Sequence, residues 1–307
     1  MNIKSIYKIL LVALLGMSIM ACEDKINPTL ESAEPVLVVD AWLNNKMENQ
    51  VISLTKTQPY FENLLPPGVS GATVTVTDNH DKVYSFTEDI SHPGNYIWTP
   101  EAGKVFGNVG DTYELTIDFD NEIFTSTSHM GRVPAIDSIT FDSDDQTRSN
   151  KKMYRGEFWA TDLVGPGDTY WIKAYKNGVL LTKPSEINIA YDAGFSAGGV
   201  TDGVPFITPK RRGINPNDKD ADNNTISPYV PGDSVNVQIN SITLEAFNFL
   251  NEVITQTDRP GGFQELFATP LENVSTNVVN SNPNGSKVVG FFNVSAVSTL
   301  GKKFKNP

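Results

Sequence analysis

Short segments of alternating apolar and polar residues recur along most of the chain, and turn-forming residues separate them. The clearest is Ala72 to Thr77, in which threonine alternates with valine or alanine. Because successive side chains of a strand point to opposite faces, such alternation indicates strands with one buried and one solvated face. Similar segments cover 36–43, 51–55, 83–86, 96–98, 112–119 and 123–128. About seven short strands in roughly 100 residues predict an immunoglobulin-like β-sandwich over residues 35–132.

A second β-rich domain is predicted over residues 133–307. Its boundary is placed at Val133-Pro134, because proline cannot donate to a strand ladder. Strand patterns then cover 136–141, 153–161, 169–176, 179–181, 235–242 and 287–297. Thr243 is a helix N-cap residue, and an apolar stripe follows it at helical spacing. We therefore expect one amphipathic helix over residues 244–256, packed against the second sheet of a mostly β protein.

Residues 191–232 are rich in Gly, Asp, Asn and Pro and show little periodicity. A loop of this length within a compact domain is usually functional or disordered. Aromatic residues of this loop and of the Pro-rich loop 57–71 are candidates for contacting a ligand or partner. They are Tyr60, Phe61, Tyr191, Phe195, Phe206 and Tyr229. The alternative is that these rings fold inward over the sheet ends, while Trp42, Trp98, Trp159 and Trp171 are expected in the core.

The N-terminus has the pattern of a lipoprotein signal peptide over residues 1–21. Two lysines precede an apolar segment that is too short to span a bilayer as a mature helix. The segment ends in Ile19-Met20-Ala21-Cys22, which fits the rule of an aliphatic residue at −3 and a small one at −1. We predict acylation of Cys22 and a flexible polar tether over residues 22–34. Glu23 and Asp24 resemble a surface-export signal, with a plain acidic tether as the alternative.

The chain has 307 residues and a formal net charge of −12. Loss of residues 1–21 removes two lysines and no acidic residue, so the mature charge is −14. Such a surface repels nucleic acid and anionic lipid headgroups, and argues against nucleic-acid partners and against membrane contact beyond the lipid. Cys22 is the single cysteine, so its acylation leaves no disulfide. About 285 mature residues suffice for two domains with cores of their own.

Three patterns in the sequence bear on possible chemistry. The segment 194–198 fits G-x-S-x-G, but neither Gly199 nor Pro205 favours the helix that a nucleophile elbow needs, and all histidines precede Ser196. His80, His92 and His129 are widely spaced and are expected at the surface, without a zinc site. Asp218, Asp220 and Asp222 place oxygen ligands at every second residue. That spacing allows a calcium site, and the alternative is a solvated acidic loop.

Several stretches resemble one family of lipoproteins. They are the lipobox with Cys22-Glu23-Asp24, residues 36–43, 59–61 and 67–74, Val133 to Ile139, Ser241 to Leu250 and Gly290 to Val297. In this order they resemble the Bacteroidota lipoproteins grouped as domain of unknown function 4249. The resemblance implies a cell-surface location and a gene neighbourhood that often includes a TonB-dependent outer-membrane transporter. It implies no catalytic residues.

These observations together predict a function without catalysis. We expect an outer-membrane lipoprotein, facing the cell exterior, that binds a ligand or partner as an accessory to a TonB-dependent transporter. A structural or adhesive surface protein is the first alternative, and a hydrolase of unrecognised type is the second. The sequence predicts no cofactor apart from the calcium alternative.

Overall fold

The structure is a computed structural model that describes residues 34–59, 62, 64–144 and 152–305. Contacts group Pro35–Pro307 into one compact unit, apart from Met1–Glu34. The signal peptide, Cys22, the Glu23-Asp24 pair, Tyr60 and Phe61 lie outside the described residues, so the expectations for them stay predictions. In the described part of the chain, no helix has both the length and the apolar character needed to cross a membrane.

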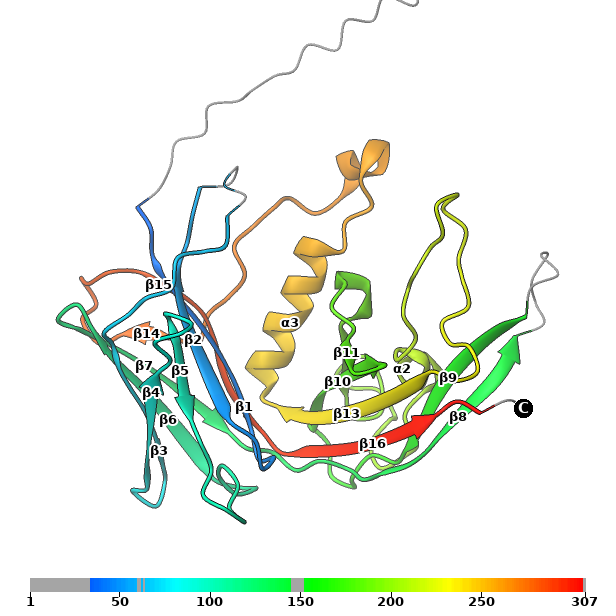
Figure 1. The fold of residues 1–307 in the computed structure, drawn as a ribbon, viewed down its shortest axis with the longest axis horizontal. Coiled ribbons are helices and arrows are strands. Elements are labelled where there is room, and N and C mark those ends of the chain that lie inside the picture. Colours follow the sequence, from blue (N-terminus) through cyan, green and yellow to red (C-terminus); the bar gives the residue numbers. More distant parts are fainter. Residues whose placement is uncertain (1–33, 60–61, 63, 145–151, 306–307) are drawn as a thin grey trace, which may run out of the picture. The chain divides into compact units, whose positions relative to one another are not determined.

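The first sheet has nine strands in the order β14-β7-β6-β3-β4-β5-β2-β1-β15 (Figure 1). The seven strands predicted within 35–132 are present. They are β1 (Leu37–Asn44), β2 (Gln50–Lys56), β3 (Thr73–Asp78), β4 (Val83–Glu88), β5 (Asn95–Trp98), β6 (Thr112–Phe119) and β7 (Glu122–His129). Two later strands, β14 (Val279–Asn280) and β15 (Val288–Ser295), complete it.

This sheet nearly closes on itself, which differs from the two packed sheets of the predicted immunoglobulin-like sandwich. The strand β4 pairs with both β3 and β5, so the strands form one continuous path. The path closes between its last strand, β15, and β7, which is next to the first strand. There the Val294 amide of β15 donates to the Ser128 hydroxyl of β7 at 2.9 Å. Alternate residues of each strand fill the interior, as Leu37, Val39, Ala41 and Leu43 of β1 do. The mostly β class is therefore confirmed, with a different arrangement of the sheet.

The rest of the unit is built on two smaller sheets. One sheet follows the order β11-β10-β13-β16, and β12 also pairs with β10; the other sheet is the hairpin β8-β9. Their bounds are β8 (Ile136–Asp144), β9 (Met153–Ala160), β10 (Thr169–Lys176), β11 (Val179–Leu180), β12 (Asn188–Tyr191), β13 (Ser234–Ile242) and β16 (Val297–Lys303). The helical segments are η1 (Pro184–Glu186), α2 (Thr208–Arg212), α3 (Leu244–Thr257) and η2 (Gly262–Phe267).

The strand predicted at 287–297 differs from the structure in a way that matters for the architecture. It divides at Ala296 into β15, which pairs in parallel with β1, and β16, which pairs with β13. The chain therefore returns to the nine-stranded sheet long after residue 133. Its last segment, β15 with β16, links that sheet to the sheet that contains β13. Gly290 allows this return, since its positive φ of 108° and missing side chain let β15 approach Val39 closely.

The predicted amphipathic helix is confirmed as α3. The Thr243 hydroxyl caps it by accepting from the Ala246 amide at 3.1 Å. Its buried face joins an aromatic cluster in which the Trp42 ring lies 5.0 Å from Trp171 and 5.6 Å from Phe291. Because these rings come from β1, β10 and β15, the cluster ties the two large sheets together. Trp159 departs from the expected core position, with 37% of its surface exposed.

Candidate functional site

The loop 191–232 is anchored by its aromatic residues. Phe206 and Tyr229 are fully buried in the core of the second sheet, and the Tyr229 hydroxyl donates to the Ile214 carbonyl at 2.5 Å. These two rings fold inward, as the alternative held, and so they offer no face to a ligand. Tyr191 is half-buried, 6.1 Å from the Phe247 ring, whereas Phe195 exposes 59% of its surface.

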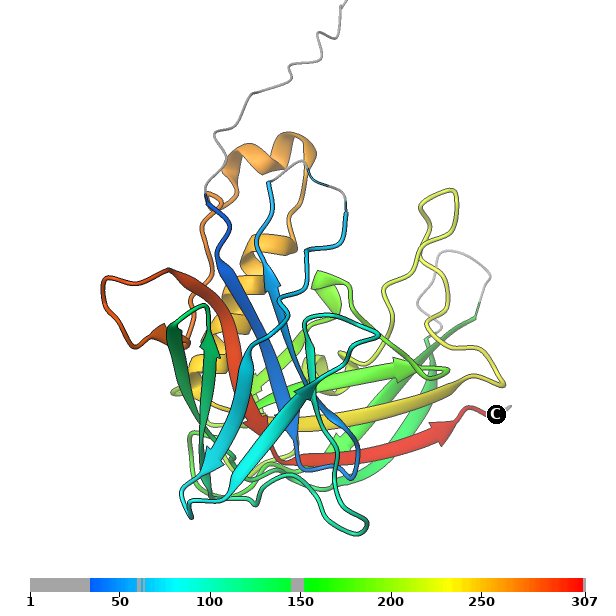
Figure 2. The same cartoon turned by 60° about the vertical axis from the view of Figure 1, so that its left-hand side comes forward.

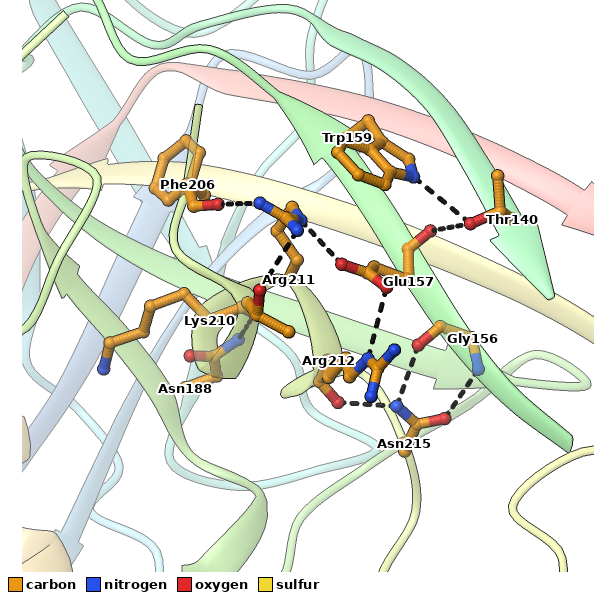
Figure 3. A network of polar contacts seen from close by, with 11 residues as sticks. Thr140, Gly156, Glu157, Trp159, Asn188, Phe206, Lys210, Arg211, Arg212 and Asn215 are labelled. Carbon is orange, nitrogen blue, oxygen red and sulfur yellow. Dashed lines mark hydrogen bonds and ion pairs between the residues drawn. The ribbon is translucent and has the colours of Figure 1, made fainter. Parts of the chain in front are cut away.

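The anchored loop presents α2 to the face of β9. There Glu157 is 4% exposed and accepts from Arg211 Nε at 2.7 Å and from Arg212 Nε at 3.2 Å (Figure 3). Arg211 also donates to the Phe206 carbonyl at 2.5 Å and to the Thr208 hydroxyl at 3.2 Å. Its guanidinium lies 4.1 Å from the ring of Trp159, which occupies an exposed position of β9.

Asn215 holds this arrangement rigidly against β9. Its side-chain oxygen accepts from the Gly156 amide at 2.7 Å, and its side-chain nitrogen donates to the Gly156 carbonyl at 2.8 Å. The same nitrogen donates to the Arg212 carbonyl at 2.6 Å. The amide side chain therefore imitates a neighbouring strand, and it fixes the backbone of Arg212 relative to Glu157.

Two guanidinium groups share one carboxylate at this place, which leaves a surplus positive charge on an acidic protein. Each side-chain nitrogen of Arg211 donates one hydrogen bond and the side chain is largely buried, but Arg212 exposes 43% of its side chain. Of the three guanidinium nitrogens of Arg212, only Nε has a hydrogen-bond partner among the described residues. Both terminal nitrogens are therefore available. A free guanidinium fork of this kind suits a carboxylate, phosphate or sulfate group.

Lys210 lies on the other side of α2. It is 8% exposed, and its Nζ lies 4.2 Å from the Phe195 ring without an ion pair in the described part of the chain. Burial disfavours the charged ammonium and lowers the pKa of Lys210 to about 8. The Asn188 side chain donates to the Lys210 carbonyl at 2.8 Å and holds α2 from this side (Figure 3).

Two cavities flank α3. One of about 560 Å³ is lined by His129 to Arg132, Gly167 to Thr169 and the strand end before α3, and the Arg132–Asp168 ion pair at 2.7 Å lies in its wall. The other, of about 590 Å³, lies between α3 and the outer face of β7 and β15. It is lined mainly by hydroxyl, amide and carboxylate groups, including Glu245, Asn248 and Glu252. Either could hold a small polar ligand.

The structure does not bring the three aspartates of the calcium hypothesis together. Asp218 forms an ion pair with Lys183, and Asp220 accepts from the backbone amides of Asp222 and Asn224 within its own turn. Over the described ranges, no group of three or more His, Cys, Asp or Glu side chains is placed to hold a metal ion. The calcium site stays a prediction from the sequence, without support from these contacts.

The other residues weighed from the sequence lie near turns. His80 contacts Asp111 at 3.1 Å and His92 contacts Asp89 at 2.8 Å, both at exposed positions. Ser196 lies in an exposed bend that follows the buried turn after β12, and no helix begins there. Sequence reasoning missed Glu157, Arg211 and Arg212. The available signal was three consecutive basic residues, 210–212, within a loop of an otherwise acidic chain.

Comparison with known proteins identifies a family for this chain. No curated protein matches the chain. The family described as domain of unknown function DUF4249 matches residues 23–300, which is most of the chain and includes β1 to β15, α2 and α3. The chain belongs to this family, DUF4249.

Proposed function

We propose that the chain is a lipid-anchored outer-membrane protein that faces the cell exterior and binds a ligand without catalysis, as an accessory to a TonB-dependent transporter. The anchor is the acylated Cys22, with Glu23 and Asp24 as the export signal. The observation that carries the binding role is the exposed fork of Arg212 on its rigid support of Glu157 and Asn215. The ligand class that this group favours is an organic anion, such as an acidic sugar or a carboxylate.

The contacts of Arg212 support recognition over simple packing. A loop that needed only to neutralise Glu157 could do so with Arg211, whose Nε already lies 2.7 Å from that carboxylate. Within the described ranges, Glu157 is the one carboxylate that forms an ion pair with either Arg211 or Arg212. A fixed donor pair also loses less side-chain entropy on binding than a mobile lysine would.

Ligand binding is tested with two anionic probes, citrate and polygalacturonate, by isothermal titration calorimetry at low salt. The protein is the chain that begins after Cys22. The matched control for Arg212→Ala is Lys287→Ala, which removes one exposed positive charge elsewhere. We expect Arg212→Ala to weaken binding of at least one probe about tenfold, the effect of one charge-assisted hydrogen-bonded pair. Equal affinities of Arg212→Ala and Lys287→Ala for the probes would show that Arg212 is not part of the binding site.

The accessory role is tested in cells that carry the native gene neighbourhood. Palmitate-analogue labelling reports the anchor, and protease shaving of intact cells reports the facing. Affinity purification in mild detergent should recover a TonB-dependent transporter with the native protein, and the Cys22→Ser variant should lose it. Absence of a transporter from every native preparation, together with altered cell attachment in a deletion strain, would favour the adhesive alternative instead.

A further inference from the structure

Large apolar side chains are concentrated on the segment that follows α3. Phe263, Leu266, Phe267 and Leu271 expose 76%, 75%, 79% and 64% of their surfaces. The rings of Phe263 and Phe267 contact each other edge to face, with centroids 5.6 Å apart. Several exposed large apolar side chains within one short segment favour an interaction surface over a solvated loop.

The backbone beneath these side chains is held by polar contacts. The Arg259 side chain pairs with Glu265 and donates to the Thr269 carbonyl at 2.8 Å. The Gly261 amide donates to Glu265 at 3.2 Å, and the Glu272 amide donates to the Gln256 side chain at 3.0 Å. The apolar side chains of η2 are therefore presented on a turn that these hydrogen bonds and the ion pair support.

The patch lies at the end of the unit at which the tether joins. Leu37 at the start of β1 pairs with Lys56 at the end of β2, so Pro35 and the connection after β2 lie at one end. Both ribbon views place η2 at this same end, beyond the last turn of α3 (Figures 1 and 2). The connection after β2 adds Leu64 and Leu65, which are 74% and 91% exposed.

The length of the tether limits how far this end lies from an anchored cysteine. Residues 23–34 separate Cys22 from the unit. A chain of this length spans at most about 40 Å when extended, and its average span is about 20 Å as a flexible coil. If Cys22 carries acyl chains, the end of the unit that bears η2 is the end kept near the bilayer surface.

We propose that η2 and its flanking residues, 262–271, dock on the lipid bilayer in which Cys22 is anchored. This inference rests on the lipid anchor of the proposed function and adds a second, non-covalent membrane contact. The segment protrudes beyond α3 as a convex tip (Figure 1). Lipid can surround a convex apolar tip without shape complementarity, whereas a protein partner would need a matching hollow. The docking is apolar, so it does not need the positive surface that this acidic chain lacks.

The test attaches the protein to vesicles without relying on biological acylation. The mature chain, beginning at Cys22, is coupled through its only thiol to a maleimide lipid in phosphatidylcholine vesicles. Phe267→Trp reports contact with brominated acyl chains by fluorescence quenching. Val83→Trp is the matched control, because Val83 is also exposed, at 56%, but begins β4 at the opposite end of the strands.

We expect brominated lipid to quench the added Phe267→Trp fluorescence about twofold or more and to leave that of Val83→Trp almost unchanged. Adding Phe263→Ser to the Phe267→Trp chain should reduce the quenching, and raising the salt concentration should not. Equal quenching at both positions, or none at position 267, overturns the docking surface. Crosslinking of position 267 in cells to an outer-membrane protein and not to lipid also overturns it. Failure of palmitate labelling would instead count against the anchor, because the coupled vesicles need no acylation.

Discussion

Replacing Gly290 with alanine is expected to open the first sheet at its β1–β15 contact. A Cβ atom at this position would lie 2.0 Å from the Val39 carbonyl oxygen and 2.6 Å from the Val39 nitrogen. Both atoms belong to the backbone of β1, so no side-chain rotation relieves the clash and the paired strands must separate. The positive φ of 108° adds strain of about 1–2 kcal/mol for any L side chain. With the displaced strand included, we expect a loss of about 4 kcal/mol or more.

The matched control for this substitution is Gly178→Ala. Gly178 has a similar φ of 81° but has no atom within 4 Å of the added Cβ, so only the conformational strain remains. Both variants of the chain that begins after Cys22 are unfolded in urea and followed by tryptophan fluorescence. We expect Gly178→Ala to lose about 1–2 kcal/mol and Gly290→Ala at least twice as much. Equal losses would refute the close approach of β15 to β1.

The remaining predictions concern α2 and its surroundings. Glu157→Gln should lower the free energy of unfolding by about 2–3 kcal/mol in urea titrations, because two arginines lose their counter-charge, whereas Arg212→Ala should cost less than about 1 kcal/mol. The pKa of Lys210, about 8 in the folded chain, lies below its unfolded value. The unfolded state therefore binds more protons between these values, so stability should rise as the pH goes from about 8 to 10. Lys210→Met should flatten this rise in urea titrations at each pH and stabilise the protein at pH 7. Phe206→Ala should cost about 3–5 kcal/mol in calorimetric or urea unfolding, while Phe195→Ala should change stability by less than about 0.5 kcal/mol.

The elements predicted best from the sequence are those whose signal is local. The alternation of Ala72 to Thr77 matches β3, and the stripe after Thr243 matches α3, because each element buries one face against the rest of the unit. The closure of the first sheet could not be predicted in this way. It depends on a parallel pairing between β1 and β15, which are separated by most of the chain. Parallel pairing of distant segments leaves no mark on either strand alone.

The candidate site shows a different limit, since apolar residues in an irregular segment have two possible uses. Phe206 and Phe195 are both aromatic residues between turn-forming neighbours, yet one is buried and the other exposes 59% of its surface. Hydrophobic periodicity cannot tell which of the two rings is buried, because that depends on which ring reaches the core of the second sheet. The buried rings hold the loop in place, and that anchoring is what allows the basic residues of α2 to keep a fixed position over β9. In this loop the buried rings provide the support, and under the proposed function the basic residues 210–212 supply the groups that contact the ligand. A sequence search for binding residues in this family should therefore weigh an unbalanced basic run between buried aromatics above the aromatics themselves.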